Sequence, residues 1–566
     1  MAVFDLPLYG ERTALRDGDE TWSYAQLAAS VADFQARLSD GRLLVFLEVR
    51  NNAASVIAYL ACITAGHVVH LYSDYDPVQL DLLTGLYNPH HVIRSCNLDA
   101  GDIQPRHGEV LNLHPDLCLL LSTSGSTGAA KFVRLSRGNL TTNADSICTY
   151  LGIGPTDSVL LNLKLNYSYG LSVLNTHMRA GGCVVLTEAS VADDAFWNIL
   201  EREKVTSFPG VPYSFEMIER SGRLKDVAGL RYVTQAGGRL DPRLVRHFAD
   251  EGRRHGWKFF VMYGQTEAAP RISYLPPDQM DTHANCIGIP IPGGRLWLRD
   301  DSGAPVSAAN TPGELIYEGA NVMMGYAEGL SDLALESGPA ILATGDVACR
   351  NAEGLYYIVG RLKRFVKPFG VRISLDDIES EGRTTAPGTI ATGNDKRIVL
   401  VSDVAEEIEV LTARLDELRH KYCLPPGILS VRRVAAIPRL LNGKIDYPSL
   451  KRDLLPEETV SRSTGPIGIG GGLKRLFSVA FVGRFFMEFA GLMGFGATSV
   501  GSFRDVFAEL MGRLVNEADS FRSLAGDSLS YVQISLAIEE RLGFLPDNWE
   551  ALTIKSLQER YDAKAV

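Results

Sequence analysis

Short apolar runs alternate with longer amphipathic stretches through the first half of the chain. Runs of strand length lie at 43–49, 67–71, 158–163, 183–186, 205–209, 230–235 and 259–263. Helix-length stretches, such as 24–38, 194–203 and 243–255, separate most of these runs. Strands that alternate with helices indicate parallel βαβ units, so we predict a large, layered α/β core. In such folds ligands bind beyond the carboxyl ends of the strands.

The pattern changes after about residue 275, where short β segments and turns predominate and indicate a β-rich subdomain. Residues 361–452 form a compact unit of basic to mixed charge, and residues 457–472, which end in a glycine cluster, are typical of a linker. A chain of 566 residues is too long for one core. We therefore predict a core at 1–360, a small unit at 361–452, a linker at 453–500 and a helical domain at 501–566.

Within the linker, residues 473–500 are unusually apolar. Arg484 and Glu488 interrupt them, and no uninterrupted apolar stretch reaches the length of a transmembrane helix. We expect a helix packed against a neighbouring domain. A partner-docking or membrane-surface segment is the alternative.

Composition and charge narrow the class of partner. The formal net charge of -11 argues against a nucleic acid bound through its phosphates. The eight cysteines are scattered without a CxxC pair, so neither a zinc site nor a disulfide framework is indicated. The N-terminus lacks the pattern of a signal peptide, and we expect a cytoplasmic protein with reduced thiols and no membrane partner.

The most distinctive chemistry follows the apolar run that ends at Leu121. Residues 122–128 are all small or hydroxylated, and Lys131 lies just beyond. Little side-chain bulk, several hydroxyls and accessible backbone N–H groups are what close contact with phosphate oxygens requires. No Gly-Lys-Ser/Thr ends the segment, so it is not a P-loop. A flexible surface loop is the alternative interpretation.

These segments, in this order, resemble the adenylate-forming superfamily of acyl-CoA synthetases, luciferases and peptide-synthetase adenylation domains. Residues 122–131 are similar to its phosphate loop, and Tyr263-Gly264-Gln265-Thr266-Glu267 resembles its YGxTE motif. Gly313-Glu314-Leu315, Gly325-Tyr326, Thr344-Gly345-Asp346, Gly360-Arg361 and Asn442-Gly443-Lys444-Ile445-Asp446 match later motifs. Gly526-Asp527-Ser528-Leu529, before an apolar helical pattern, resembles the attachment site of acyl or peptidyl carrier domains; a helix N-cap serine is its alternative.

The resemblance implies a large layered α/β adenylation core, a small mobile α+β lid and a C-terminal helical-bundle carrier domain. It implies that the core binds ATP through Thr123, Ser124, Gly125, Ser126, Thr127, Gly128, Lys131, Gly238, Tyr263, Gly264, Gln265 and Asp346. Lys444, Thr266, Glu267 and Arg361 are the implied catalytic residues. Glu267 would also hold Mg²⁺, Lys363 would be the hinge of the lid, and Ser528 would carry 4′-phosphopantetheine.

The resemblance also places the acid-binding pocket. Its candidate residues are Asn166, Tyr167, Ser168, Tyr169, Val211, Tyr213 and Gly237. Members that activate amino acids have an aspartate near Tyr169, and this chain has no carboxylate there, so a free α-amino acid is disfavoured. The Asn166-Tyr167 pair is similar to that of aryl-acid-activating members, and aryl and short aliphatic acids both stay open.

The expected reaction is ATP-dependent activation of a small carboxylic acid, followed by transfer to the phosphopantetheine of the chain's own carrier, in natural-product biosynthesis of the peptide or polyketide type. A phosphopantetheinyl transferase and downstream biosynthetic enzymes would then be partners. Two alternatives remain: an acyl-CoA ligase that uses free CoA, and a scaffold in which an inactive adenylation domain presents a carrier.

Overall fold

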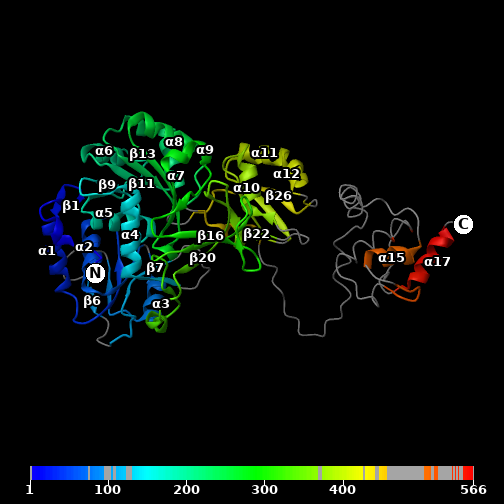
Figure 1. Ribbon diagram of the computed structural model, residues 1–566, viewed down its shortest axis with the longest axis horizontal. Coiled ribbons are helices and arrows are strands. Elements are labelled where there is room, and N and C mark those ends of the chain that lie inside the picture. The colour runs from blue at the N-terminus through cyan, green and yellow to red at the C-terminus, as the bar shows by residue number, and fades with distance from the viewer. Residues whose placement is uncertain are drawn as a thin grey trace. The chain divides into compact units, whose positions relative to one another are not determined.

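The computed structural model forms two compact units, Met1–Glu457 and Glu458–Val566, each described here by itself (Figure 1). The residues that it describes are 3–73, 75, 77–94, 103–105, 110–122, 131–366, 373–394, 396–422, 424, 427–439, 445–455, 502–511, 515–520, 538, 542, 546 and 552–564.

The larger sheet of the first unit contains nine of the described strands, in the order β15-β14-β13-β12-β11-β9-β10-β1-β2. They are β1 (Thr13–Asp17), β2 (Glu20–Ser23), β9 (Ser158–Leu161), β10 (Cys183–Leu186), β11 (Ser207–Gly210), β12 (Tyr232–Gln235), β13 (Lys258–Gly264), β14 (Arg271–Leu275) and β15 (Ile289–Pro290). β13, β12, β11, β9, β10 and β1 are parallel to one another. β14 and β15 at one edge, and β2 at the other, pair antiparallel with their neighbours. The carboxyl ends of β12 and β13 therefore lie side by side.

The second sheet has the order β19-β8-β7-β4-β3-β5-β6 within the described ranges. Its strands are β3 (Leu44–Glu48), β4 (Val68–Tyr72), β5 (His91–Ile93), β6 (Ile103–Pro105), β7 (Leu117–Ser122), β8 (Phe132–Ser136) and β19 (Gly325–Ala327). β7 is the buried strand predicted before the hydroxyl-rich segment. It pairs antiparallel with β8, so this segment joins two neighbouring strands.

Helices cover both faces of the two sheets (Figure 1). One continuous apolar core joins the sheets through α1 (Tyr24–Gln35), α2 (Ala53–Ala65), α4 (Arg137–Leu151) and α5 (Ser168–Ala180). The outer face of the larger sheet packs on α6 (Asp194–Arg202), α7 (Pro212–Ser221) and α8 (Pro242–His255). The outer face of the second sheet packs on α3 (Pro77–Tyr87). Capping boxes at Ser23 and Ser136 satisfy free backbone N–H groups where α1 and α4 begin.

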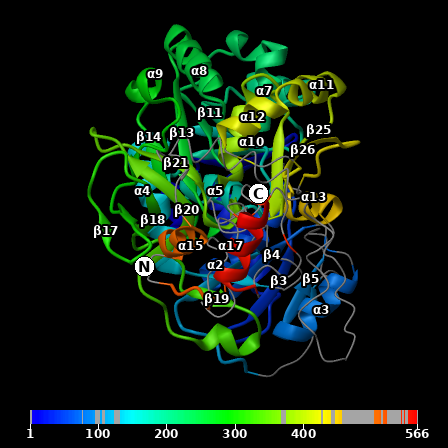
Figure 2. The ribbon, with the colours of Figure 1, turned by 90° about the vertical axis from the view of Figure 1, so that its right-hand side faces the viewer.

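A third, antiparallel sheet follows, as the change of pattern after residue 275 predicted. Its described strands are, in order, β17 (Pro305–Val306), β16 (Arg295–Arg299), β18 (Gly313–Glu318), β20 (Ile341–Arg350) and β21 (Tyr356–Arg361), and Figure 2 labels all of them except β16. The short helices of the unit are η1 (Leu6–Tyr9), η2 (Arg223–Asp226), η3 (Thr266–Ala268), η4 (Pro277–Gln279), α9 (Met280–His283), η5 (Leu330–Ala334) and η6 (Leu362–Arg364).

The last part of the first unit has its own small apolar core. It contains β22 (Phe365–Val366), β23 (Ile373–Ser374), β24 (Ile390–Asn394), β25 (Arg397–Ser402) and β26 (Leu429–Arg433), with α10 (Leu375–Arg383), α11 (Ala405–Ala413), α12 (Leu415–Lys421) and α13 (Tyr447–Leu454). These elements mix helices and strands, and the mobile lid that the resemblance implies for residues 361–452 stays a prediction.

The second unit is described at α15 (Phe503–Met511), α17 (Ile554–Lys564) and a few residues between them. Phe503 and Phe507 of α15 share an apolar cluster with Ile554 and Leu557 of α17. The helical-bundle carrier domain stays a prediction, and the apolar stretch 473–500 lies outside the described residues. No helix in the described ranges is both long enough and apolar enough to cross a membrane.

Candidate functional site

The carboxyl end of β13 brings four of the predicted site residues together. The Tyr263 hydroxyl donates a hydrogen bond to the Asp346 carboxylate. Gln265 Nε2 donates to the backbone oxygen of Thr344 at 2.8 Å and to Asp346 Oδ2 at 3.3 Å. Arg361 Nε lies 3.1 Å from Asp346 Oδ1. These contacts join the end of β13 to the third sheet.

The pairing of β20 with β21 explains this ion pair, because Asp346 and Arg361 lie directly opposite each other in the antiparallel register. The Asp346 side chain is only 5% exposed, whereas that of Arg361 is 62% exposed. Burial and the neighbouring Asp346 carboxylate raise the pKa of Tyr263 well above its usual range, so the phenol stays protonated and donates. The result is a fixed, buried carboxylate beneath an accessible guanidinium.

A second cluster surrounds Glu267, which lies in η3 just beyond β13. The Tyr326 hydroxyl donates to Glu267 Oε1 at 2.9 Å. The Lys131 ammonium lies 3.6 Å from the centre of the Tyr326 ring and 3.7 Å from Glu328 Oε1. Burial and the Glu267 carboxylate raise the pKa of Tyr326, which keeps its hydroxyl protonated.

This second cluster depends on the register of β19 with β8, in which Tyr326 lies opposite Val133. Gly325-Tyr326 matches a motif of the resembled family, but the match by itself predicts no function for Tyr326. A tyrosine on a strand of three residues offers little signal by itself. Its place in a motif is the clearest sequence signal that Tyr326 has a function. The sequence does not reveal its partner, because Glu267 is distant from it along the chain.

The surroundings of Glu267, the predicted magnesium ligand, fit such an ion. Within the described ranges no group of three or more His, Cys, Asp or Glu side chains is arranged to hold a metal. Mg²⁺ usually keeps several waters and takes one or two protein carboxylates together with phosphate oxygens, so a single carboxylate suits it when a nucleotide is bound. Tyr326 engages Oε1 of Glu267. Among the described residues, no hydrogen bond reaches Oε2.

Three residues predicted for the acid pocket meet at Gly237, which follows β12. Its φ of +90° is in the region that favours glycine. A Cβ atom there would lie 2.5 Å from the Tyr167 hydroxyl and 3.3 Å from Val211 Cγ1. Gly237, Tyr167 and Val211 therefore pack closely together, with no room for a Cβ atom at residue 237. Ser168 Oγ lies 3.1 Å from Thr266 Oγ1 and connects the start of α5 to the Glu267 cluster.

The other residues predicted for the acid pocket or the nucleotide site near β12 and β13 have different partners. Tyr169 is buried, and its hydroxyl donates to Thr234 on β12. Tyr213 is 47% exposed, and the Arg439 guanidinium lies 5.3 Å from the centre of its ring. Asn166 is partly buried, and Gly238 accepts a hydrogen bond from Gln235 at its backbone oxygen. The backbone turns back sharply at Gly264, where a Cβ atom would lie 2.0 Å from the Pro270 oxygen.

Several predicted residues lie outside the described residues, namely Thr123, Ser124, Gly125, Ser126, Thr127, Gly128, Lys444 and Ser528. The side chain of Lys363 is also not described. The flanking residues are described: the Ser122 hydroxyl lies 2.8 Å from that of Tyr75, and Lys131 immediately precedes β8. Arg439 and Ile445 form an isolated β-bridge on either side of the segment that contains Lys444.

One network near Arg361 was not anticipated. The Arg361 backbone N–H donates to Asp376 Oδ2 at 3.1 Å, at the start of α10. Arg364 pairs with Asp376 at 2.5 Å and with Glu379 at 2.9 Å. The Tyr447 hydroxyl donates to Glu379 at 3.0 Å and its ring lies under Arg364. These contacts attach the last part of the first unit to the end of β21.

Comparisons with known proteins found similarities over much of the chain. The sequence pattern of the family described as AMP-binding enzyme matches residues 7–327, more than half of the chain. Feruloyl-CoA synthase of an Amycolatopsis species is 28% identical over 402 residues, which are 65% of this chain and 79% of that protein. The L-proline--[L-prolyl-carrier protein] ligase of Streptomyces coelicolor is 28% identical over 372 residues, 62% of this chain and 68% of that protein.

Solved structures share the fold. The o-succinylbenzoate CoA synthetase of Bacillus subtilis, in complex with its acyl-adenylate intermediate, has a TM-score of 0.62 and 22% sequence identity. The alignment covers 79% of this chain and 97% of that one. The same enzyme has also been solved in complex with ATP and a magnesium ion.

Proposed function

Because this chain belongs to the AMP-binding enzyme family, we propose that it activates a small carboxylic acid with ATP and transfers the acyl group to the phosphopantetheine of its own carrier domain. Enzymes of this family are acid–thiol ligases that act by ATP-dependent adenylation of the acid. We also propose which residues of the first unit act in the reaction, which thiol accepts the acyl group, and that residues 501–566 carry this thiol.

The chemical problem is that a carboxylate is a poor electrophile. In the proposed first step a carboxylate oxygen of the acid attacks the α-phosphorus of ATP, the bond from that phosphorus to the bridging oxygen of pyrophosphate breaks, and acyl-AMP forms. In the second step a thiol attacks the acyl carbon, its proton is lost to solvent, the bond from that carbon to the AMP oxygen breaks, and AMP leaves. Charge develops on phosphate oxygens in the first step, so positioned cations and hydrogen-bond donors supply most of the catalysis.

The described contacts suggest a role for each residue. Asp346, held by Tyr263, Gln265 and Arg361, is suited to accept hydrogen bonds from the ribose hydroxyls. Arg361 is exposed enough to reach the ribose or the phosphates. Thr266 Oγ1, next to Ser168, lies between the nucleotide side and the acid pocket.

The remaining assignments concern the phosphates. Lys131 and the hydroxyl-rich segment before it would hold the triphosphate, together with Gly238, Gly264 and their neighbours. Glu267 would hold Mg²⁺, which when bound neutralises phosphate charge. Lys444 would reach the reacting carboxylate and α-phosphate from the segment between Arg439 and Ile445, and Lys363 would be the hinge of that part of the chain.

One observation carries the proposal. Residues that are far apart in the sequence, from Lys131 through Glu267 to Asp346 and Arg361, are brought by three different sheets to the carboxyl end of β13. There they form two linked clusters, one with a buried carboxylate and the other with a partly buried one, each with a cation nearby. Binding a nucleotide together with a metal ion requires carboxylates, for the ribose and the metal, and cationic side chains, for the phosphates, at one place.

The carrier is the second part of the proposal. Phosphopantetheine on Ser528 would supply the thiol that accepts the acyl group, and a phosphopantetheinyl transferase would be needed to attach it. The relative from Streptomyces coelicolor, whose name describes a ligase for a carrier protein, supports this thiol. The feruloyl-CoA synthase supports free CoA as the alternative thiol. Downstream biosynthetic enzymes would then take the acyl group.

Intact mass spectrometry of the full chain separates these possibilities. The phosphopantetheinylated protein is incubated with ATP, Mg²⁺ and one acid at a time, without CoA. A mass gain equal to the acid minus water, absent in Ser528→Ala, supports self-loading. If acyl-CoA forms on addition of CoA while the protein mass is unchanged, the ligase alternative holds. If neither product forms with any acid and no ATP is consumed, the chain is a scaffold.

A further inference from the structure

Arg271 is a charged residue in a place where charge is costly. It begins β14, opposite Gly264 of β13, and the first three residues of this strand are all buried. Its relative exposure is 2%. A buried ion needs a partner, because removing it from water costs several kcal/mol unless it is paired.

The surroundings of Arg271 contain aromatic rings and no described anion. Its guanidinium lies 4.8 Å from the centre of the Tyr169 ring. Burial raises the pKa of Tyr150 and of Tyr167 to about 12, and the positive charge of Arg271 opposes that rise. Nε of Arg271 has no hydrogen-bond partner. Among the described residues no carboxylate forms an ion pair with it.

Arg134 shows what a self-sufficient buried arginine is like in the same protein. It is equally buried, at 2% exposure. Its guanidinium donates to the backbone oxygens of Leu335 at 2.6 Å, Met324 at 3.1 Å and Glu336 at 3.3 Å. Nε of Arg134, like that of Arg271, has no partner, so the difference lies in the terminal nitrogens. Three carbonyl groups compensate the charge of Arg134 without a ligand, and no such set surrounds Arg271 in the described part of the chain.

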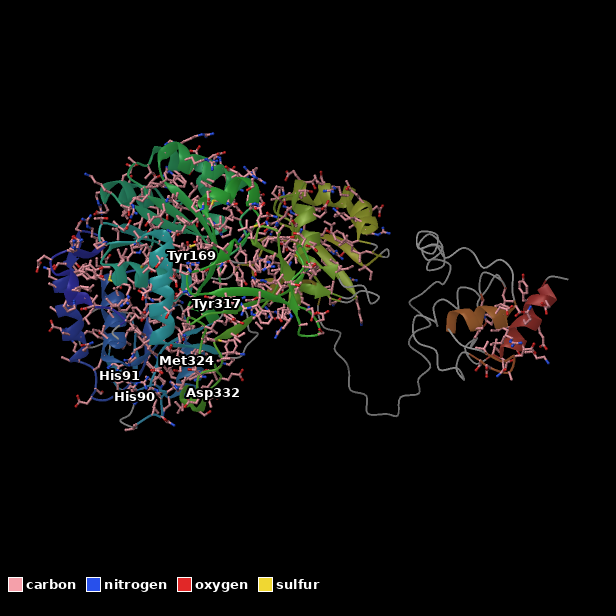
Figure 3. All side chains as sticks on the ribbon, viewed as in Figure 1. His90, His91, Tyr169, Tyr317, Met324 and Asp332 are labelled. Carbon is pink, nitrogen blue, oxygen red and sulfur yellow. The ribbon has the colours of Figure 1, made fainter. Side chains whose placement is uncertain are left out.

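Arg271 lies beside a tyrosine of the predicted acid pocket and lines a cavity. Its guanidinium lies 4.8 Å from the centre of the Tyr169 ring, which lies 6.2 Å from the centre of the Tyr167 ring, and the Tyr167 hydroxyl lies close to Gly237. Arg271 also lines a cavity of about 20 Å³ together with Tyr169, which Figure 3 labels inside the first unit. The hydroxyl of Ser207 lines the same cavity and likewise lacks a partner. A cation, unsatisfied polar atoms and some free volume therefore coincide.

We propose that Arg271 is a binding residue for a second negatively charged group on the acid, so that the substrate is a dicarboxylic acid. This inference rests on the proposed function, because it concerns the acid pocket of that site. The carboxylate that reacts must lie at the Thr266 and Glu267 end, next to the nucleotide. The other carboxylate lies at the far end of the acid and pairs with the guanidinium of Arg271.

The test compares acids of matched shape in ATP–pyrophosphate exchange with the full chain. The pairs are glutarate against pentanoate and terephthalate against 4-methylbenzoate. We expect the wild type to prefer the diacid of at least one pair by about 30-fold in kcat/KM, in the range of a hydrogen bond to a charged group. Arg271→Met is expected to lose that preference and to change the kcat/KM for the monoacid less than threefold. Arg271→Lys, which keeps the charge, is expected to retain part of it.

Three results would overturn the inference. The first is a wild type that prefers the monoacid of both pairs. The second is an Arg271→Met variant whose kcat/KM values for both acids are unchanged. The third is a variant that loses both acids equally, which would place Arg271 on the reacting carboxylate. Arg220→Met, at an exposed arginine of α7, is the control for a lost positive charge. If Arg271→Met does not fold, the inference is judged by whether the wild type prefers the diacid or the monoacid of each pair.

A binding measurement distinguishes this inference from the proposed function. Isothermal titration calorimetry of the wild type with each acid, without nucleotide, reports on the pocket alone. Exchange with monoacids but not diacids overturns the inference and leaves the proposed function intact. Absence of exchange with every acid overturns the proposed function, and calorimetry then decides for Arg271: diacid binding that Arg271→Met abolishes supports it, and absence of binding refutes it.

Discussion

The hydrogen bond from Tyr326 to Glu267 gives a sharp prediction about magnesium. Tyr326→Phe removes one oxygen and keeps the ring on which the Lys131 ammonium lies. The lost bond joins a phenol to a carboxylate at 2.9 Å, and both side chains are partly buried. Hydrogen bonds to charged groups contribute about 1.5–3 kcal/mol, and loss of a residue that orients a metal ligand typically costs 10–100-fold in metal affinity or activity.

We therefore expect the half-saturating Mg²⁺ concentration to rise about tenfold in Tyr326→Phe. The assay is ATP–pyrophosphate exchange at saturating acid and fixed ATP, with Mg²⁺ varied. Tyr87→Phe is the matched control, because its hydroxyl donates to the backbone oxygen of Ala327 at 2.8 Å on the same strand and does not contact Glu267. An unchanged Mg²⁺ dependence in Tyr326→Phe, or an equal change in Tyr87→Phe, would refute the reasoning.

Three further predictions concern the lid, the pocket and stability. Lys444→Ala should slow acyl-adenylate formation about a hundredfold or more and spare thioester formation from supplied acyl-adenylate; equal loss in rapid-quench assays of both steps would contradict its role. Gly237→Ala should raise the KM for the acid and lower the free energy of unfolding by about 1–3 kcal/mol, because φ at residue 237 is positive and the new Cβ would meet the Tyr167 hydroxyl. If neither the KM nor the free energy of unfolding changes, Gly237 does not belong to the acid pocket. Burial lowers the pKa of His70 from 6.5 to about 4, so this residue favours the unfolded, protonated chain as the pH falls below 6.5. His70→Phe should reduce the loss of unfolding free energy between pH 7 and pH 5 by roughly 2 kcal/mol in urea titrations, and an unchanged difference would contradict this.

The strands of the larger sheet were predictable because each is a short apolar run between polar turns. The runs at 183–186 and 259–263 became β10 (Cys183–Leu186) and β13 (Lys258–Gly264) within one residue at each end. The helical stretch 243–255 became α8 (Pro242–His255) in the same way. The antiparallel pairing of β7 with β8 was not predicted, because a segment rich in Ser, Thr and Gly suits a hairpin connection as well as a ligand loop.

Contacts between distant strands account for what the sequence analysis missed. Tyr326 reaches Glu267 only because β19 pairs with β8, which is distant from it in the sequence. The Asp346–Arg361 pair was predicted residue by residue, yet its geometry depends on the register of two strands. Arg271 was overlooked. The sequence offered one signal for Arg271, namely a charged residue at the start of a largely apolar strand. Only the three-dimensional arrangement shows that no described anion lies beside it.

Acid-dependent ATP–pyrophosphate exchange in the wild type and in Asp346→Ala tests the central claim most directly. The account predicts that exchange requires an acid and Mg²⁺, and that Asp346→Ala raises the KM for ATP at least tenfold while the KM for the acid changes little. Exchange that is unaffected by Asp346→Ala, or no exchange with any acid tried, would contradict a nucleotide site at the carboxyl end of β13.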